Sequence, residues 1–263
     1  MIGRLRINNT SSGSTRGALD KLAPLVSLSG FLLLWSMVSY LNIFPRVMLP
    51  SPVDVARAAI VEAVSGNILQ SLINSLKHYS LGLLWGSSLG VTMGLIVGWY
   101  KLAEALAEPL IRIFRPIPPL AWIPFAILWM GISHAAAAFL IGLQAFWICL
   151  LNTYSGVKST DRNLIEAVMC FGETNRLRLL KKVVLPSSLP YILSGIRISL
   201  GQGWLTVIAA ELFGIPGLGQ RLIEAGMNLA MNVVVVYMIV IGIMYYLIDK
   251  VYKIVEEILL AWR

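Results

Sequence analysis

The sequence predicts an all-α integral membrane protein with six transmembrane helices. Only 13% of the 263 residues are charged and 57% are hydrophobic, whereas about a quarter of the residues in soluble globular proteins are charged. Long segments also lack charge, and each is long enough to cross a hydrocarbon core of about 30 Å as a helix. A transmembrane β-barrel would need short segments of alternating polarity, and the sequence lacks such a pattern.

Each predicted span is a long apolar segment that is free of charge or nearly so. The charge-free spans are Leu22–Pro45, Tyr79–Tyr100, Pro116–Ser133, Ala135–Val157 and Ala225–Ile248. A further span, Val183–Ala210, is interrupted only by Arg197. Residues 1–21 are polar and predict a disordered cytoplasmic tail, so the six-helix domain is assigned to residues 22–263.

Lys and Arg residues set the predicted orientation in the membrane. When the six spans are threaded with the N-terminus inside, only Arg46, Arg57, Lys77 and Arg221 of the 21 Lys and Arg residues lie outside. Because cytoplasmic segments are enriched in Lys and Arg, both termini are predicted to lie in the cytoplasm of a multi-pass protein of the cell (inner) membrane. The net charge of +8 follows from this topology and from attraction to membrane lipid, and requires no nucleic-acid partner.

Two of the spans have an unusual composition. Glycine recurs at every fourth position of the second span, at Gly82, Gly86, Gly90, Gly94 and Gly98. This spacing removes side chains along one ridge and allows another helix to approach closely. The third span begins "RPIPPLAWIP", and prolines remove backbone donors from a helix. Two interpretations of that span stay open, a broken helix beside a cavity and a kinked helix that only packs.

The segment 159–186 differs from the rest of the chain because it is both basic and amphipathic. Asp161, or the neighbouring Ser159 or Thr160, can cap a first short helix. Apolar residues recur at helical spacing after this cap. Gly172 can end the helix in the left-handed conformation. The pattern therefore predicts a compact helical element between two long apolar spans.

A second short helix is predicted directly after this glycine. Thr174 can cap it, its basic face includes Arg176 and Arg178, and Pro186 closes it before the fifth span begins. By its charge, the segment is typical of a helix that lies on anionic lipid. Docking to a partner protein is the alternative.

The same segment resembles the EAA loop of the permease subunits of ATP-binding-cassette (ABC) importers. The resemblance rests on Glu166, Ala167 and Gly172, and on the "VVLP" that ends at Pro186. Further motifs resemble the nitrate, sulfonate, taurine and bicarbonate branch of that family between Leu49 and the C-terminus: "LPSPVDV", "RPIPPLAWIPFAILWMGI", "LLNTYSGVKS", "LPYILSGIRISLG", and "WLTVIAAEL" followed by "GLGQ". The aliphatic sulfonate and taurine permeases are the most similar.

The resemblance implies a type I ABC importer permease fold, in which the loop 159–186 is the coupling helix that sits in a groove of the ATPase subunit. The residues implied in coupling are Asp161, Glu166, Ala167, Gly172, Arg176, Arg178 and Pro186. Two departures from the family pattern occur: Val168 replaces the usual second Ala, and the spacing from Gly172 to Pro186 is one residue longer. We expect the extra residue in the turn or the second short helix, which leaves open which of residues 173–177 contact the ATPase.

The resemblance also implies the partners. No G-x-x-x-x-G-K-[ST] phosphate loop occurs in the sequence, so ATP hydrolysis is assigned to two copies of a cytoplasmic ABC ATPase subunit. The chain is not expected to be an enzyme or to hold a metal or cofactor. A second copy of this permease would complete the pathway as a homodimer, and a solute-binding protein would deliver the substrate at the outer face.

The resemblance does not define one substrate. An organic sulfonate such as taurine or an alkanesulfonate is favoured, with nitrate, bicarbonate and vitamin precursors as alternatives. A second class of function also stays open, a membrane-embedded enzyme or a scaffold with a basic lipid-binding loop. His78 and His134 lie near the predicted outer boundary, and we expect them to be interfacial rather than catalytic.

Polar side chains within the spans predict the lining of a pathway, because such groups are costly in lipid and face a protein interior or a cavity. The candidates are Gln144, Asn152, Arg197, Gln202, Trp204, Thr206 and Glu211. Arg197 can also snorkel to the cytoplasmic headgroups, and Trp204 can be a packing residue. Arg197, Gln202 and Thr206 would contact a passing anion weakly. Glu211 would instead hold an outer gate through a hydrogen bond.

Overall fold

The part of the chain that the structure describes is built from helices. A computed structural model describes residues 13–41, 45 and 47–259. The elements in chain order are α1 Gly13–Tyr40, α2 Pro52–Val64, α3 Asn67–Trp99, α4 Lys101–Phe114, a 3₁₀ turn Pro119–Trp122, α5 Ile123–Met130, α6 His134–Lys158, α7 Arg162–Cys170, α8 Arg176–Leu179, a π-helical turn Leu180–Val184, α9 Leu185–Glu211, α10 Leu218–Met227 and α11 Met231–Leu259. No strand occurs within the described ranges, and the predicted all-α class is confirmed.

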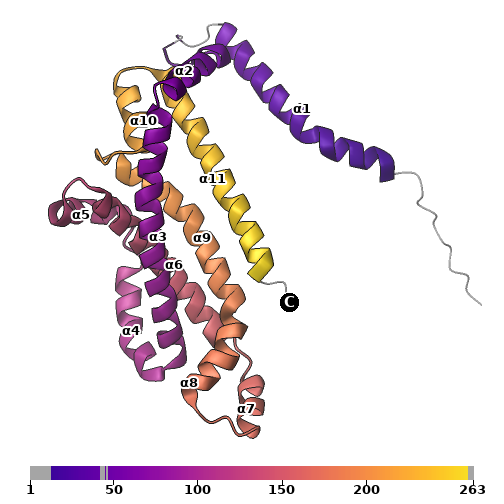
Figure 1. Cartoon of the computed structure of the whole chain (residues 1–263), viewed down its shortest axis with the longest axis vertical. Helices are drawn as coiled ribbons and strands as arrows, with labels where there is room; N and C mark the ends of the chain where they lie inside the picture. Colours follow the sequence, from indigo (N-terminus) through magenta and orange to yellow (C-terminus); the bar gives the residue numbers. More distant parts are fainter. Residues whose placement is uncertain (1–12, 42–44, 46, 260–263) are drawn as a thin grey trace, which may run out of the picture.

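Several helices are long and apolar enough to cross a membrane. Four of them qualify alone: α3, α6, α11 and the continuous helix Arg176–Glu211, which contains α9. Counted as one bent span, the pair of α4 and Pro119–Met130 would bring the number to five. In α1 the apolar stretch Val26–Tyr40 is shorter, and Figure 1 shows α1 standing away from the other helices. The count of six spans therefore stays a prediction.

Helices α3 and α6 share the most extensive contact between described elements. The glycine ridge of α3 lies in this contact, and a Cβ atom added at Gly86 would lie 2.6 Å from the Cα atom of Gly142. A Cβ atom at Gly94 would lie 2.6 Å from Cβ of Thr153. The predicted close approach of a helix to this ridge is confirmed, because only hydrogen fits between the two helices.

The third crossing differs from its prediction. It begins at Lys101, where α4 turns back from the end of α3, and not at Pro116. Helix α4 and the segment Pro119–Met130 meet at an angle of 85°, and Figure 1 shows α5 projecting sideways near the middle of α3. The prolines lie at the break because each removes a donor and disfavours helical backbone at the residue before it. A broken helix, not a kinked one, is therefore observed.

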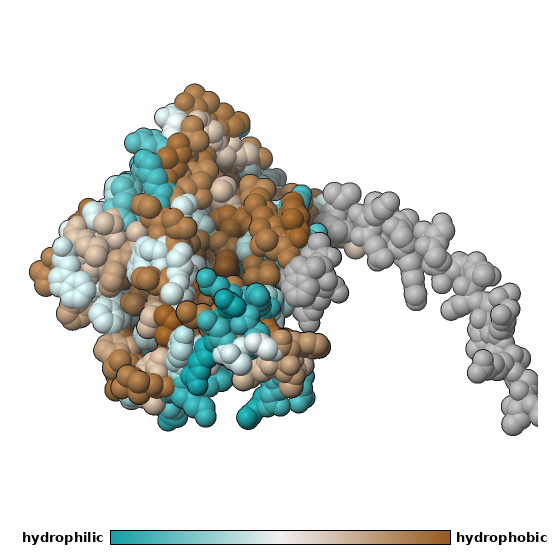
Figure 2. Space-filling model, turned by 60° about the horizontal axis from the view of Figure 1, so that its bottom comes forward, coloured by the Kyte–Doolittle hydropathy of each residue, from teal (hydrophilic) through white to brown (hydrophobic). Residues whose placement is uncertain are grey.

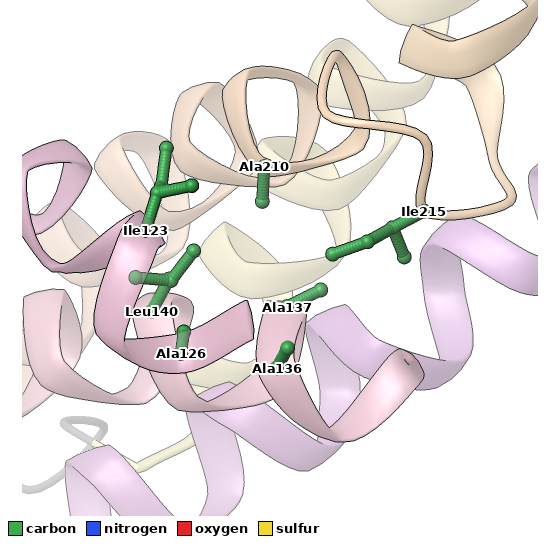
Figure 3. Close-up of a cluster of buried hydrophobic side chains, with 7 residues drawn as sticks. All are labelled: Ile123, Ala126, Ala136, Ala137, Leu140, Ala210 and Ile215. Atoms are coloured by element: carbon green, nitrogen blue, oxygen red, sulfur yellow. The ribbon is translucent and has the colours of Figure 1, made fainter. Parts of the chain in front are cut away.

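Helix α5 is held at this angle by small residues. Ala126 of α5 packs with Ala136 and Ala137 at the start of α6 and with Ala210 near the end of α9, and each is at most 1% exposed. Ile215, in the loop after α9, closes the cluster (Figure 3). Because alanine side chains are short, three segments meet closely here, and α5 is bound to the end of α9 that carries Glu211.

Helices α2 and α10 form the end of the bundle opposite α7 and α8 (Figure 1). Glu62 of α2 is 9% exposed and accepts hydrogen bonds from Tyr237 (2.8 Å) and Arg221 (3.2 Å). Burial alone would raise the pKa of Glu62, but the hydrogen bonds from Tyr237 and Arg221 outweigh burial and lower it. The charged carboxylate therefore ties α2 to α10 and α11.

The predicted disordered tail, residues 1–21, lies in part outside the described residues. Residues 13–21 are described, and they continue α1 as helix. The disordered tail and its boundary at residue 22 stay predictions.

Candidate functional site

Helices α7 and α8 form a hairpin between α6 and α9, which we call the α7–α8 hairpin (residues 161–179). Asp161 is the N-cap of α7, and its carboxylate accepts a hydrogen bond from the backbone N–H of Asn163 at 2.9 Å. Gly172 has a φ of +91°, the left-handed conformation predicted for the helix end. The first helix and its two boundaries therefore follow the prediction.

The cap of the second helix differs from the prediction. Asn175, not Thr174, is the N-cap of α8, and its side chain accepts from the backbone N–H of Leu177 at 2.9 Å. Asn and Thr are both good caps, so the register of the turn decides between them. Glu173 holds that turn through ion pairs to Arg178 (3.7 Å) and Lys182 (3.5 Å).

Pro186 does not close a separate helix as predicted. Helix α8, the π-helical turn Leu180–Val184 and α9 follow one another without a break, and Pro186 lies in the first turn of α9. A proline ring inside a helix clashes with the carbonyl four residues earlier, and the wider π turn directly before it relieves that clash. A π turn also contains one residue more than an α turn. The π-helical turn after α8 can therefore accommodate the longer spacing between Gly172 and Pro186.

All the predicted coupling residues are exposed on this hairpin or at its base: Asp161, Glu166, Ala167, Gly172, Arg176, Arg178 and Pro186. Among the described residues, Glu166 forms an ion pair with Arg162 of its own helix, at 3.0 Å. The turn also exposes Phe171, whose exposed fraction is 92%, a residue that no sequence pattern indicated. Figure 2, which turns this end of the molecule forward, shows hydrophilic residues gathered in its lower part against a largely hydrophobic surface.

Five of the seven predicted pathway residues line two separate hollows. Gln144 and Asn152 of α6 line a hollow of about 330 Å³ beside the break of the third crossing. Arg197, Gln202 and Trp204 line a larger hollow of about 730 Å³ between α9 and α11. Among the described residues, these side chains therefore line two hollows and not one continuous pathway.

Arg197 is held by acidic residues of α11. Its guanidinium group lies 3.4 Å from the carboxylate of Asp249 and 3.4 Å from that of Glu256. The side chain is 40% exposed. The sequence left two alternatives for Arg197, snorkelling to the headgroups and a role in the pathway, and neither of them predicted these ion pairs. Arg197 is therefore largely neutralised by its own chain, which weakens any attraction to a passing anion.

The deeper candidates on α9 have structural partners. Trp204 is 1% exposed, and its indole N–H donates to the carbonyl of Ile241 at 3.1 Å. It is therefore a packing residue as well as part of the wall of the larger hollow. The hydroxyl of Thr206 is bonded to the carbonyl of Gln202 within the same helix at 3.0 Å and lines neither hollow. Gln202 is exposed at the larger hollow.

Glu211 is fully buried at the end of α9 and accepts three hydrogen bonds. The donors are Ser75 (2.6 Å), Nε2 of His78 (2.7 Å) and the backbone N–H of Gly219 (2.6 Å). Nδ1 of His78 lies 3.1 Å from Nδ1 of His134. Helices α3, α9 and α10 are thus joined through one carboxylate, and α6 is linked to it through His78.

The expectation of an interfacial position is wrong for His78, which is fully buried at 0% exposure. Its ring is drawn inward because the buried carboxylate of Glu211 needs donors. The glycine-rich "GIPGLGQ" loop surrounds the same carboxylate, and a Cβ atom at Gly219 would lie 2.9 Å from Cβ of Glu211. The hydrogen bonding predicted for Glu211 is observed, and its role in a gate stays a prediction.

These features are those of a membrane protein: a bundle of helices long enough to span a membrane, hollows that contain polar side chains, and an exposed helical hairpin at one end. The family described as "Binding-protein-dependent transport system inner membrane component" matches residues 86–261. The chain therefore belongs to this family of transport components.

Curated relatives support the same assignment over most of the chain. A Brucella abortus protein named as an ABC transporter permease is 37% identical over 82% of this chain and 87% of its own length. The taurine transport system permease protein TauC of Escherichia coli is 32% identical, covering 90% of this chain and 88% of its own. The permease protein SsuC of Bacillus subtilis, named for aliphatic sulfonates transport, is 32% identical, covering 88% and 83%.

A solved structure shows the same fold. A chain of the MetNI methionine ABC transporter, in an inward-facing conformation, matches with a TM-score of 0.62. The match covers 71% of this chain and 93% of that chain at 23% sequence identity. At this identity the likeness concerns the fold alone, and the permease fold of ABC importers implied by the sequence is confirmed.

Proposed function

We propose that this chain is the channel subunit of an ATP-driven importer, which moves a small anion from an outer solute-binding protein into the cytoplasm. Two copies of a cytoplasmic ABC ATPase would supply the energy. Because the family comprises transport components, the alternative hypothesis of a membrane-embedded enzyme has less support. The α7–α8 hairpin is the observation that carries the proposal, as the contact for the ATPase.

Rigidity supports this role for the hairpin. Capped helices and the Glu173 ion pairs hold its shape, and α8 continues without a break into α9. A push on such a hairpin is transmitted along a single helix to Glu211, at the far end of α9. Helices resist bending over this length, whereas a flexible loop would absorb the movement.

Both termini are proposed to lie in the cytoplasm, and the direction of α11 supports this position for the C-terminal end. The end of α11 points toward the same side of the bundle as the α7–α8 hairpin (Figure 1). Lys and Arg residues also concentrate on that side of the predicted topology, as expected for the cytoplasmic face. A homodimer is proposed because one copy supplies few spanning helices, and a two-fold axis completes a pathway with identical halves.

The substrate proposal rests on the names of the relatives. The permeases TauC and SsuC are named for taurine and for aliphatic sulfonates, and a relative from Synechococcus elongatus is a bicarbonate transport system permease protein. All three solutes carry an anionic group. An organic sulfonate is therefore the favoured substrate of this chain, with bicarbonate, nitrate and vitamin precursors as alternatives.

Co-purification with the ATPase subunit tests the proposal. Gly172→Val should weaken ATPase binding about tenfold, because a β-branched residue at φ of +91° costs about 1–2 kcal/mol and shifts the turn. Glu166→Ala should weaken binding without changing the backbone. Gly66 is a matched control, since its φ is +77° and nothing lies within 4 Å of an added Cβ atom, but it lies at the α2–α3 connection.

The control makes the outcome specific to the hairpin. Gly66→Val carries the same kind of backbone strain at the opposite end of the bundle and should bind the ATPase as the unchanged protein does. Equal ATPase binding by Gly172→Val, Glu166→Ala and Gly66→Val would contradict the proposed docking site.

A further inference from the structure

The smaller hollow contains an arginine without an acidic partner, Arg115. It caps the C-terminal end of α4 and lines the hollow together with Gln144 and Asn152 of α6. No acidic residue lines this hollow, and no carboxylate within the described ranges pairs with Arg115. In the larger hollow, by contrast, Arg197 is paired with acidic residues of α11. The two arginines therefore differ in the charge that they offer to a solute.

Arg115 also lies farther from the start of the third crossing than the sequence predicted. Threading of the spans placed it on the cytoplasmic side, before a span beginning at Pro116. In the structure, the 14 residues of α4 separate it from Lys101, a distance of about 20 Å at about 1.5 Å per residue. Figure 1 shows the break after α4 near the middle of α3.

An arginine that follows the 14 residues of α4, at the break of the third crossing, needs a physical reason. Charged side chains within a membrane are costly, face a protein interior or a water-filled cavity, and mark the route of an ion or substrate. Backbone that leaves helical conformation at membrane depth is likewise tolerated only beside protein or a cavity. Both features coincide at Arg115 and the prolines that follow it, so the hollow is a place where water and a polar solute can enter.

The hollow offers donors suited to an anion. Arg115 presents a planar fork of N–H groups that matches two oxygens of a sulfonate or carboxylate. Gln144 has two amide donors. Asn152 donates one N–H to the carbonyl of Ile148 at 2.8 Å, which leaves the second available. A volume of about 330 Å³ lies in the range of small-ligand sites, about 300–1,000 Å³.

We propose that this hollow is an anion-binding station of the pathway, with Arg115 pairing with the anionic group of the solute and the amides of Gln144 and Asn152 beside it. The inference rests on the proposed function, since it takes the passing solute to be a small anion. One cation and two neutral donors bind weakly enough to release the solute again. A phosphate group of membrane lipid has the same chemistry, and the experiment separates the two sources.

Thiol labelling measures the charge of the hollow without any substrate. Ile148 lines it between the two amides, so Ile148→Cys places a thiol there in a Cys170→Ser background, since Cys149 is buried. An anionic reagent, 2-sulfonatoethyl methanethiosulfonate, is compared with a cationic one, 2-(trimethylammonio)ethyl methanethiosulfonate. Arg115→Gln should lower the ratio of anionic to cationic labelling rates about tenfold, because a nearby unit charge attracts one reagent and repels the other.

Two variants at neighbouring positions serve as controls. Arg115→Lys keeps the charge and should keep most of the preference for the anionic reagent. Arg112→Gln removes a cation one turn earlier, but Arg112 is 77% exposed and paired with Glu108, so the ratio should change less than about twofold. An unchanged ratio in Arg115→Gln, with all variants eluting as folded protein, overturns the proposal.

The lipid alternative is tested by repeating the labelling in vesicles that contain phosphatidylglycerol. If lipid phosphate occupies Arg115, the anionic preference seen in detergent disappears in these vesicles, and the proposal is overturned. Persistence of the preference supports a site for a free anion. Labelling needs neither the ATPase nor a transported solute, so a failure of the proposed importer function leaves this result intact and distinguishable.

Discussion

Replacement of Gly86 by Ala should destabilise the contact between α3 and α6. The added Cβ atom would lie 2.6 Å from Cα and 2.8 Å from the carbonyl carbon of Gly142. Both are backbone atoms, so no side chain can rotate away and the helices must separate. Overpacking costs about 1–3 kcal/mol, and the better helix propensity of Ala offsets about 1 kcal/mol of this. With the upper value of the overpacking cost, Gly86→Ala lowers the free energy of unfolding by about 2 kcal/mol.

Thermal unfolding of the purified protein in detergent measures this loss. A change of 1 kcal/mol shifts the melting temperature of a chain of this size by about 2–4 °C, so Gly86→Ala should melt about 4–8 °C lower. Gly242 of α11 is the matched control, because nothing lies within 4 Å of an added Cβ atom. Gly242→Ala should melt slightly higher, by helix propensity alone. If Gly86→Ala melted no lower than Gly242→Ala, the close-packing argument would be refuted.

Three further predictions concern the polar clusters and the assembly. The lowered pKa of Glu62 implies stability that is present above its ordinary value of 4.5 and lost as pH falls through the lowered folded value, so thermal unfolding of Glu62→Gln should depend less on pH below 4.5 than that of the unchanged protein. Glu211→Gln leaves one of three buried donors unsatisfied, at about 1–3 kcal/mol, and should lower both the melting temperature and uptake in vesicles; unchanged values would remove the cluster from the mechanism. Native mass measurement of the active complex should give two permease copies, and activity with a single copy would contradict the homodimer.

Features that depend on a few neighbouring residues could be predicted from the sequence. Apolar length indicated the spanning helices, and the period of four in the glycines of α3 indicated its contact face, because both follow from helix geometry. Asp161 and Gly172 were recognised as boundaries because an N-cap and a left-handed C-terminal residue are local requirements. The family resemblance added the fold, which no local pattern determines.

Predictions were wrong where two local backbone conformations have similar free energies. Thr174 and Asn175 are adjacent residues that both cap helices well, and the ion pairs of Glu173 accompany the register that selects Asn175. Pro186 could end a helix or lie inside one, and the π-helical turn before it decides for continuity. The prolines of the third span were predicted to lie at its start, but in the structure they lie at a break in its middle.

The sequence by itself determined the class of protein, the helices and the helical hairpin, because hydrophobic length, residue spacing and capping act within one segment of chain. Only the tertiary structure decided which polar groups meet. Glu211 accepts hydrogen bonds from Ser75 and His78 on α3, and Arg197 is paired with acidic residues of α11. Arg115 lies beside amides of α6 and has no acidic partner in the part of the chain that the structure describes. Buried charges take whichever partners helix packing brings within a few ångströms, and that proximity is not encoded in any single segment.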